Sequence, residues 1–314
     1  MAASMRLQIL GILHSTRNIK PFYNDVRIKF NRKLSSQSHN YCLNILRKHD
    51  YENYLCLLLL PSQALAPAVA VRAFNAEIAG IRDNVSERMI GQMRFRFWKD
   101  ALENIYKGRP PDHPIATELH RAVGSHKLSK RWLSRLLEAR EESIDDKAFQ
   151  TLEAAEQHAE NTASSTLYLI LESLGVQNLH ADHAASHVGR AQGLATLIRS
   201  VPFHARRRNV LLPMDVTSKH KVSHEDIFRG KIDQRVKDVI FEIASRANMH
   251  LETARSFRQD VPKEAFPLLL VTRPLQDFVD AIQKADFNAF DPKLQKRNYM
   301  LPLRLWLQQM RRTY

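Results

Sequence analysis

The spacing of hydrophobic residues along most of this chain is helical. From Tyr41 onward, apolar residues return about every three or four positions, and no stretch alternates apolar and polar residues as a half-buried strand would. The alanine-rich segment 62–84 is apolar on most faces, which suits a buried helix, and the segments 146–174 and 182–201 carry the apolar content of a central core. We therefore predict an all-α fold.

Capping residues and prolines predict where several helices begin and end. Ser86 is expected to cap the helix that ends before Gly108, and Ser223 with Asp226 has the spacing of a capping box. The prolines expected to end or break helices are Pro202, Pro274, Pro292 and Pro302. No linker rich in glycine or serine divides residues 41–314, so these residues are predicted to form a single domain.

Residues 1–40 differ from the rest of the chain in composition. They carry seven Lys or Arg residues and one acidic residue, Asp25, with serine and apolar residues scattered between them. That composition is typical of a mitochondrial presequence, and processing is expected to end near residues 32–36. A flexible basic arm is the alternative interpretation of the same residues.

The net charge falls once this segment is set apart. The formal charge is +14, from 47 basic and 33 acidic residues, whereas residues 41–314 carry 40 and 32, or +8. Much of the basic excess is therefore attributed to targeting. The sequence also contains no zinc-finger or RNA-recognition motif, so we expect no nucleic-acid partner. The longest uncharged apolar run, Leu55–Leu60, is too short to span a bilayer.

Several short segments resemble a known enzyme family in their order and spacing. The sequence FWKD at 97–100 is followed by GRP at 108–110 and HP at 113–114, and GRAQGL stands at 189–194. This arrangement is similar to the squalene and phytoene synthase family, all-helical enzymes that join two isoprenyl diphosphates. The resemblance covers nearly all of residues 41–314 and implies an isoprenoid-synthase-like helical bundle.

The resemblance also implies where a metal site would lie. In that family, two facing helices each present carboxylates four residues apart, and these hold magnesium ions against a diphosphate. The first acidic motif falls on Ala79, Gly80 and Asp83 and the second on Ser200 and His204, so only Asp83 keeps a carboxylate. A serine hydroxyl is a weak magnesium ligand, and imidazole suits zinc or copper better. We therefore infer that the condensation activity has been lost, and we expect no catalytic residue, metal or other cofactor.

A presequence on such a body resembles a non-catalytic mitochondrial branch of the same family. That resemblance implies a protein of the mitochondrial matrix, peripheral to the inner membrane, that acts in the assembly of respiratory complex I (NADH:ubiquinone oxidoreductase). Its partners would be complex I assembly intermediates or other assembly factors. The alternative is a prenyl-diphosphate or lipid-modifying transferase with residual or altered chemistry at the same pocket.

Basic residues are candidates for contacts with a phosphate group or a cardiolipin-rich surface, since arginine forks match phosphate oxygens. The candidates are Arg72, Arg199, Arg206, Arg207 and Arg208. His183 and His187 share a helical face, as a zinc site would require, but no HExxH pattern surrounds them. Ordinary surface or core histidines are the favoured interpretation of this pair.

Overall fold

The computed structural model describes residues 37–85, 87–145 and 147–314. The predicted presequence, 1–40, lies outside the described residues except for its last four, which begin α3. Every regular element in the described residues is a helix, which confirms the all-α prediction. The α-helices are α3 (Gln37–His49), α4 (Tyr51–Leu57), α5 (Ser62–Ala79), α6 (Arg88–Tyr106), α7 (Pro114–His126), α8 (Lys130–Glu142), α9 (Leu152–Ala159), α10 (Ser165–Ser173), α11 (Leu179–Arg206), α12 (Met214–Lys219), α13 (His224–Phe228), α14 (Gln234–Ser256), α15 (Phe266–Leu269), α16 (Thr272–Lys284) and α17 (Leu301–Met310). Shorter elements are the 3-10 turns η1 (Arg82–Asn84), η3 (Phe257–Gln259), η4 (Lys263–Ala265) and η5 (Pro292–Gln295) and the π-helical turn η2 (Glu160–Ser164).

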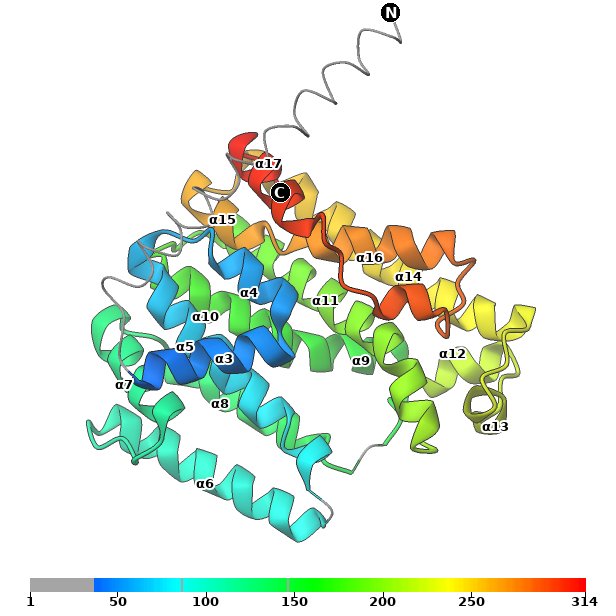
Figure 1. The fold of residues 1–314 in the computed structure, drawn as a ribbon, viewed down its shortest axis with the longest axis horizontal. Helices are drawn as coiled ribbons and strands as arrows, with labels where there is room; N and C mark the ends of the chain where they lie inside the picture. Colours follow the sequence, from blue (N-terminus) through cyan, green and yellow to red (C-terminus); the bar gives the residue numbers. More distant parts are fainter. Residues whose placement is uncertain (1–36, 86, 146) are drawn as a thin grey trace, which may run out of the picture.

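The core of the bundle is built around α11 and α5. Helix α11, the longest described helix, crosses the centre of the molecule, where it packs along α14 and contacts α9, η2, α10 and α16 (Figure 1). Helix α5 lies among α3, α7, α8 and α10 and buries four of its seven alanines together with Phe74 and Ile78. None of the described helices is both long enough and apolar enough to cross a membrane.

Two glycines allow α11 to approach α9 and η2 closely. A Cβ atom placed on Gly189 would stand 2.5 Å from the backbone nitrogen of Ser164. A Cβ atom placed on Gly193 would stand 2.2 Å from the Cβ atom of Ala159. The two glycines are one helical turn apart on the same face of α11, so a side chain at either position would force the helices apart.

The turn η2 carries a buried carboxylate that links three elements. Glu160 accepts hydrogen bonds from Tyr168 Oη of α10 at 2.6 Å, and from Ser186 Oγ at 2.7 Å and Arg190 Nε at 3.1 Å, both of α11. Burial alone would raise the pKa of Glu160, but these three donors outweigh it and hold the pKa below its ordinary value. The satisfied carboxylate therefore fixes η2 against α10 and α11.

The prediction that Pro202 ends the central helix is wrong, because α11 continues to Arg206. Pro202 lies close to the C-terminal end of α11. A proline inside a helix removes one hydrogen bond, here to the carbonyl of Ile198, and α11 keeps its helical course past that gap. The continuation carries His204 on the same helix as Ser200, one turn further along.

Other predicted boundaries were met in part. The capping box of Ser223 and Asp226 is confirmed at the start of α13. The helix predicted from residue 146 begins at Leu152 instead, where the Thr151 side chain caps α9. Ser86 lies outside the described residues, and Glu87 occupies the N-cap position of α6 without a side-chain hydrogen bond. The C-terminal prolines begin elements rather than break them, because the first helical turn needs no N–H donor; they are Pro274 in α16, Pro292 in η5 and Pro302 in α17.

Replacing Gly189 with alanine should destabilise the protein, because the added methyl group would collide with the backbone of Ser164. We expect the free energy of unfolding, measured by urea denaturation followed by circular dichroism, to fall by about 1–3 kcal/mol. Gly124→Ala in α7 is the matched control, since nothing lies within 4 Å of a Cβ atom added there. The control should be neutral or slightly stabilised, and an equal loss in both variants would contradict the account of close packing.

Candidate functional site

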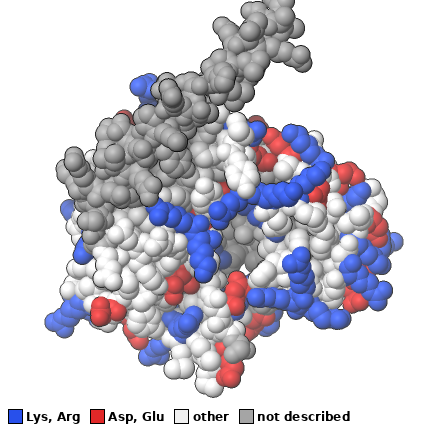
Figure 2. Space-filling view, in the orientation of Figure 1, with Lys and Arg blue, Asp and Glu red and all other residues white. Residues whose placement is uncertain are grey.

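A cavity of about 480 Å³ lies between the C-terminal end of α5 and the C-terminal half of α11. Its walls come from α5, η1, α8, α9, η2 and α11, with residues of α3, α4 and α10 adding to the lining. Figure 2 shows this face of the molecule hollowed near its middle, with Lys and Arg side chains and a few acidic ones around the hollow. The close packing of α11 on α9 and η2 sets the position of one wall relative to the others.

The structure brings the two predicted motif segments together at this cavity. Ala79 ends α5, Gly80 is its C-cap, and Asp83 lies in η1. Ser200 and His204 lie one turn apart near the end of α11, and all five residues line the cavity. The two segments therefore face one cavity, and four of the five positions assigned to the acidic motifs lack a carboxylate.

Direct contacts between side chains join the two segments. Arg82 Nη2 lies 3.4 Å from His204 Nε2, and Arg207 Nη1 lies 3.3 Å from Asp83 Oδ1. We call these two pairs the mouth contacts. They join η1 to the end of α11, so that a cation–carboxylate pair and an arginine–imidazole pair connect the segments on which the family's acidic motifs fall.

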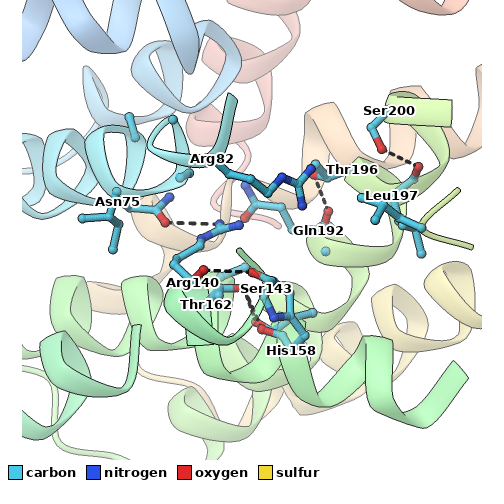
Figure 3. Close-up of a pocket in the computed structure, with 18 of the residues that line it drawn as sticks. Asn75, Arg82, Arg140, Ser143, His158, Thr162, Gln192, Thr196, Leu197 and Ser200 are labelled. Carbon is cyan, nitrogen blue, oxygen red and sulfur yellow. Dashed lines mark hydrogen bonds between the residues drawn. The ribbon is translucent and has the colours of Figure 1, made fainter. Parts of the chain in front are cut away.

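Cationic side chains outnumber carboxylates in the lining of the cavity, and three of the cations are arginines. Arg72 is buried and its Nη1 atom lies 3.2 Å from Asp50 Oδ2, while Arg140 Nη2 donates to Asn75 Oδ1 at 3.4 Å. Figure 3 shows Arg82 and Arg140 extending from η1 and α8 toward the same space. The Nε atoms of Arg72 and Arg140 are buried and have no hydrogen-bond partner among the described residues. The described lining therefore offers unpaired cationic donors, beside one unpaired acceptor, the buried Asn53 Oδ1.

The charge state of two lining residues follows from burial. Burial lowers the pKa of Arg140 to about 10, and the nearby positive charge of Arg82 adds to this effect, so Arg140 stays cationic at neutral pH. Burial lowers the pKa of His158 to about 3, and the charges of Arg140 and Arg82 lower it further. His158 is therefore neutral, and the cavity is positive because of its arginines.

The lining does not fit the magnesium ions that the family would imply. Among the described residues that line the cavity, the carboxylates are those of Asp50 and Asp83, and each already faces an arginine. No group of three or more His, Cys, Asp or Glu residues in the described ranges could hold a metal ion. Magnesium prefers several oxygen ligands. The positive charges and N–H groups of the lining suit an anion better than a cation.

The remaining predicted basic residues lie apart from the cavity lining. Arg199 pairs with Glu52 of α4 at 2.9 Å and lies 4.6 Å from the ring centre of Phe278 of α16. Arg208 pairs with Glu225 at 3.4 Å. Arg206 is exposed at the end of α11. Of the five predicted arginines, Arg72 alone lines the cavity, and contacts of the cluster 206–208 with phosphate or lipid stay a prediction.

Three residues of the lining were missed by the sequence analysis. Arg82 lies inside the first motif segment, at a position where the family pattern specifies no residue. Its place next to Asp83 was the one sequence signal that could have marked it as a lining residue. Arg140 is one of many polar residues on α8, and His158 is one of several on α9. Nothing in their local sequence distinguishes them from solvent-facing residues, because the fold alone brings them to the cavity.

The geometry of facing motif segments agrees with comparisons to known proteins. The sequence model of squalene/phytoene synthase matches residues 46–305. The chain therefore belongs to the squalene/phytoene synthase family. The crystal structure of a dehydrosqualene synthase in complex with ligand superposes with a TM-score of 0.77 at 18% identity, covering 88% of this chain and 96% of that one. Squalene synthase HpnC from Alicyclobacillus acidocaldarius gives a TM-score of 0.71, also at 18% identity, covering 81% and 95%. These two likenesses confirm the isoprenoid-synthase-like fold.

Within this family, the chain is much more similar in sequence to a curated relative than to the two synthases above. It is 52% identical to NADH dehydrogenase (ubiquinone) complex I, assembly factor 6 from Mus musculus, over 88% of this chain and 83% of the relative.

As the pH is lowered, the free energy of unfolding should fall more steeply in the natural protein than in a His158→Gln variant. The folded pKa of His158 is about 3 and its ordinary value is 6.5, so between these values the unfolded state binds the additional proton. Protonation of His158 in the unfolded state alone should lower the free energy of unfolding by about 1.4 kcal/mol for each pH unit between its ordinary pKa and its folded pKa. Urea denaturation at pH 7 and pH 5.5 should give a loss about 1 kcal/mol smaller in the variant.

An exposed histidine provides the control for this measurement. His224→Gln at the surface should show the same pH dependence as the natural chain. If His158→Gln also followed the natural chain, a neutral buried imidazole at the cavity would be contradicted.

Proposed function

We propose that this protein is a non-catalytic factor for the assembly of respiratory complex I, built on a squalene/phytoene synthase fold. The observation that carries the proposal is the set of residues at the two facing motif segments. Ala79, Gly80, Ser200 and His204 stand at positions assigned to the family's acidic residues, and the mouth contacts join the segments directly. The similarity to complex I assembly factor 6 supplies the process in which such a protein would act.

The chemistry of the cavity supports the loss of condensation. An allylic diphosphate ionises when metal ions neutralise the leaving group, and those ions need several oxygen ligands. Asp83 is the one carboxylate left at the motif positions, and its Oδ1 atom faces Arg207. Arginines can hold an anion in place, but no second group of carboxylates lies opposite Asp83 in the described lining to hold magnesium against it. The protein is accordingly proposed to be a pseudoenzyme without a metal cofactor.

The proposed setting follows from the same comparison and from the composition of the N-terminal segment. Residues 1–40 are proposed to direct the chain to mitochondria, leaving residues 41–314 as one domain on the matrix side of the inner membrane. Partners are proposed to be complex I assembly intermediates or other assembly factors. No nucleic-acid partner is proposed.

A second candidate function is a prenyl-diphosphate or lipid-modifying transferase with altered chemistry. The cavity favours it, because a space of about 480 Å³ with unpartnered Nε atoms on Arg72 and Arg140 could hold an anionic head group. Such an enzyme would depend on Asp83 and the neighbouring arginines. The two candidates therefore differ in whether Asp83 is indispensable.

Cells that lack this protein should lose assembled complex I while the other respiratory complexes stay unchanged. Re-expression of the natural chain and of Asp83→Ala should restore complex I equally, measured by native gel electrophoresis and NADH oxidation. Asp100→Ala is the matched control, since Asp100 is an exposed acidic residue of α6 outside the cavity lining.

Two results of this experiment would contradict the proposal. Normal complex I in the absence of the protein would reject the assembly function. If Asp83→Ala accumulated to the natural level but failed to restore complex I, while Asp100→Ala succeeded, the transferase would replace the non-catalytic factor as the better account.

A further inference from the structure

Helix α17 presents a stripe of large apolar side chains to solvent. Met300, Leu303, Leu307 and Met310 are all exposed, with Met310 67% accessible, and Tyr299 just before the helix is 90% accessible. At roughly 100° per residue, the four residues from Met300 to Met310 lie within about 80° of arc. They therefore form one continuous apolar face, which we call the α17 stripe.

The opposite face of α17 attaches it to the bundle. Leu301 and Leu305 are buried, and α17 contacts α4 and α16 at the edge of the molecule (Figure 1). Gln309 Nε2 donates to the carbonyl of Leu59 at 3.2 Å, and Arg304 Nη1 lies 2.7 Å from Asp277 Oδ1. The helix is thus held with its stripe directed away from the core.

The charged residues in the segment that carries the α17 stripe are all basic. Residues 293–312 contain six Lys or Arg residues and no Asp or Glu, and all six are exposed. Two of them have partners, since Arg304 pairs with Asp277 and Arg297 lies over the ring of Tyr51. The other four form no ion pair with any described residue; they are Lys293, Lys296, Arg311 and Arg312. On the same projection, Arg311 lies about 20° and Arg304 about 40° from Met300, so both border one edge of the stripe.

A second exposed apolar patch shows what distinguishes α17. Helix α6 exposes Met89, Ile90, Met93 and Phe97. Its sequence carries charges of both signs, because Asp100 and Glu103 follow the patch and basic residues stand among its members. An apolar face bordered by both signs suits a protein partner, whereas one bordered only by cations complements an anionic surface.

We propose that the α17 stripe lies in the head-group layer of an anionic membrane, with the neighbouring cations on the lipid phosphates. Amphipathic helices with cationic borders lie in the plane of the interface, their apolar face buried about 5–10 Å deep. Tyr299, just before the helix, adds an exposed aromatic ring and hydroxyl, a side chain that is enriched at membrane–water interfaces. The choice of cardiolipin as the anionic lipid rests on the proposed function, but the geometry and charge of α17 do not.

Flotation of the purified full chain with vesicles tests this proposal. The natural chain should float with vesicles of phosphatidylcholine and cardiolipin at low salt and much less with phosphatidylcholine alone. The variant Leu303→Ser/Leu307→Ser/Met310→Ser should bind at least about tenfold more weakly. Arg311→Glu/Arg312→Glu should lose at least about tenfold as well, and its remaining binding should depend less on salt.

Matched variants keep the test specific. Met93→Ser removes a methionine that is also 67% exposed, but on α6, and should bind as the natural chain does. Arg206→Glu/Arg208→Glu reverses two exposed charges at the end of α11 and should have a smaller effect than the α17 charge reversal. Because the altered α17 side chains are exposed, thermal unfolding should be unchanged and should exclude misfolding as the cause.

Three results would overturn the proposal: no flotation of the natural chain at low salt, undiminished binding of both α17 variants, or loss of binding in the 206/208 variant alone. The last would move the contact to the end of α11. Vesicle binding uses purified components, so its failure is distinguishable from a failure of the complex I measurement in cells.

Discussion

The close approach of α11 to α9 and η2 is the constraint on which the rest of this structure depends. Gly189 and Gly193 permit it, since a side chain at either position would overlap Ser164 or Ala159. Glu160 then fixes the contact by accepting hydrogen bonds from Ser186 and other donors around it. Helix α11 also packs along α14 and contacts α10 and α16. A displacement of α11 at these glycines would therefore disturb packing through most of the core.

The same constraint determines the chemistry of the cavity. With α11 held in place, its last turns bring Ser200 and His204 opposite the end of α5, which is the arrangement that a pair of metal-binding motifs requires. Here the segments are joined by the mouth contacts, and the lining presents arginine donors. A fold that is suited to metal-assisted ionisation of a diphosphate is thus combined with side chains that favour an anion without metal. The proposed loss of catalysis follows from this difference in donor type.

Local sequence signals and tertiary contacts contributed differently to what could be predicted. Helical periodicity and the Ser223–Asp226 capping box act over a few residues, and both were confirmed. Pro202 was misjudged because tertiary packing can hold a helix past a proline that the local sequence marks as its end. Arg140 and His158 reach the cavity only through the arrangement of α8 and α9 around α11, so no local pattern reveals them. The facing of the two motif segments came from the family resemblance, whereas their direct side-chain contacts required the structure.

The most direct measurement of the central claim is the release of pyrophosphate from farnesyl diphosphate by the purified protein, with and without magnesium. The account predicts no release above a boiled control under either condition, because the described lining lacks the facing groups of carboxylates that would place magnesium against the leaving group. Magnesium-dependent release that disappears in an Asp83→Ala variant would contradict it, and would show that the fold still carries out the ionisation step of its family.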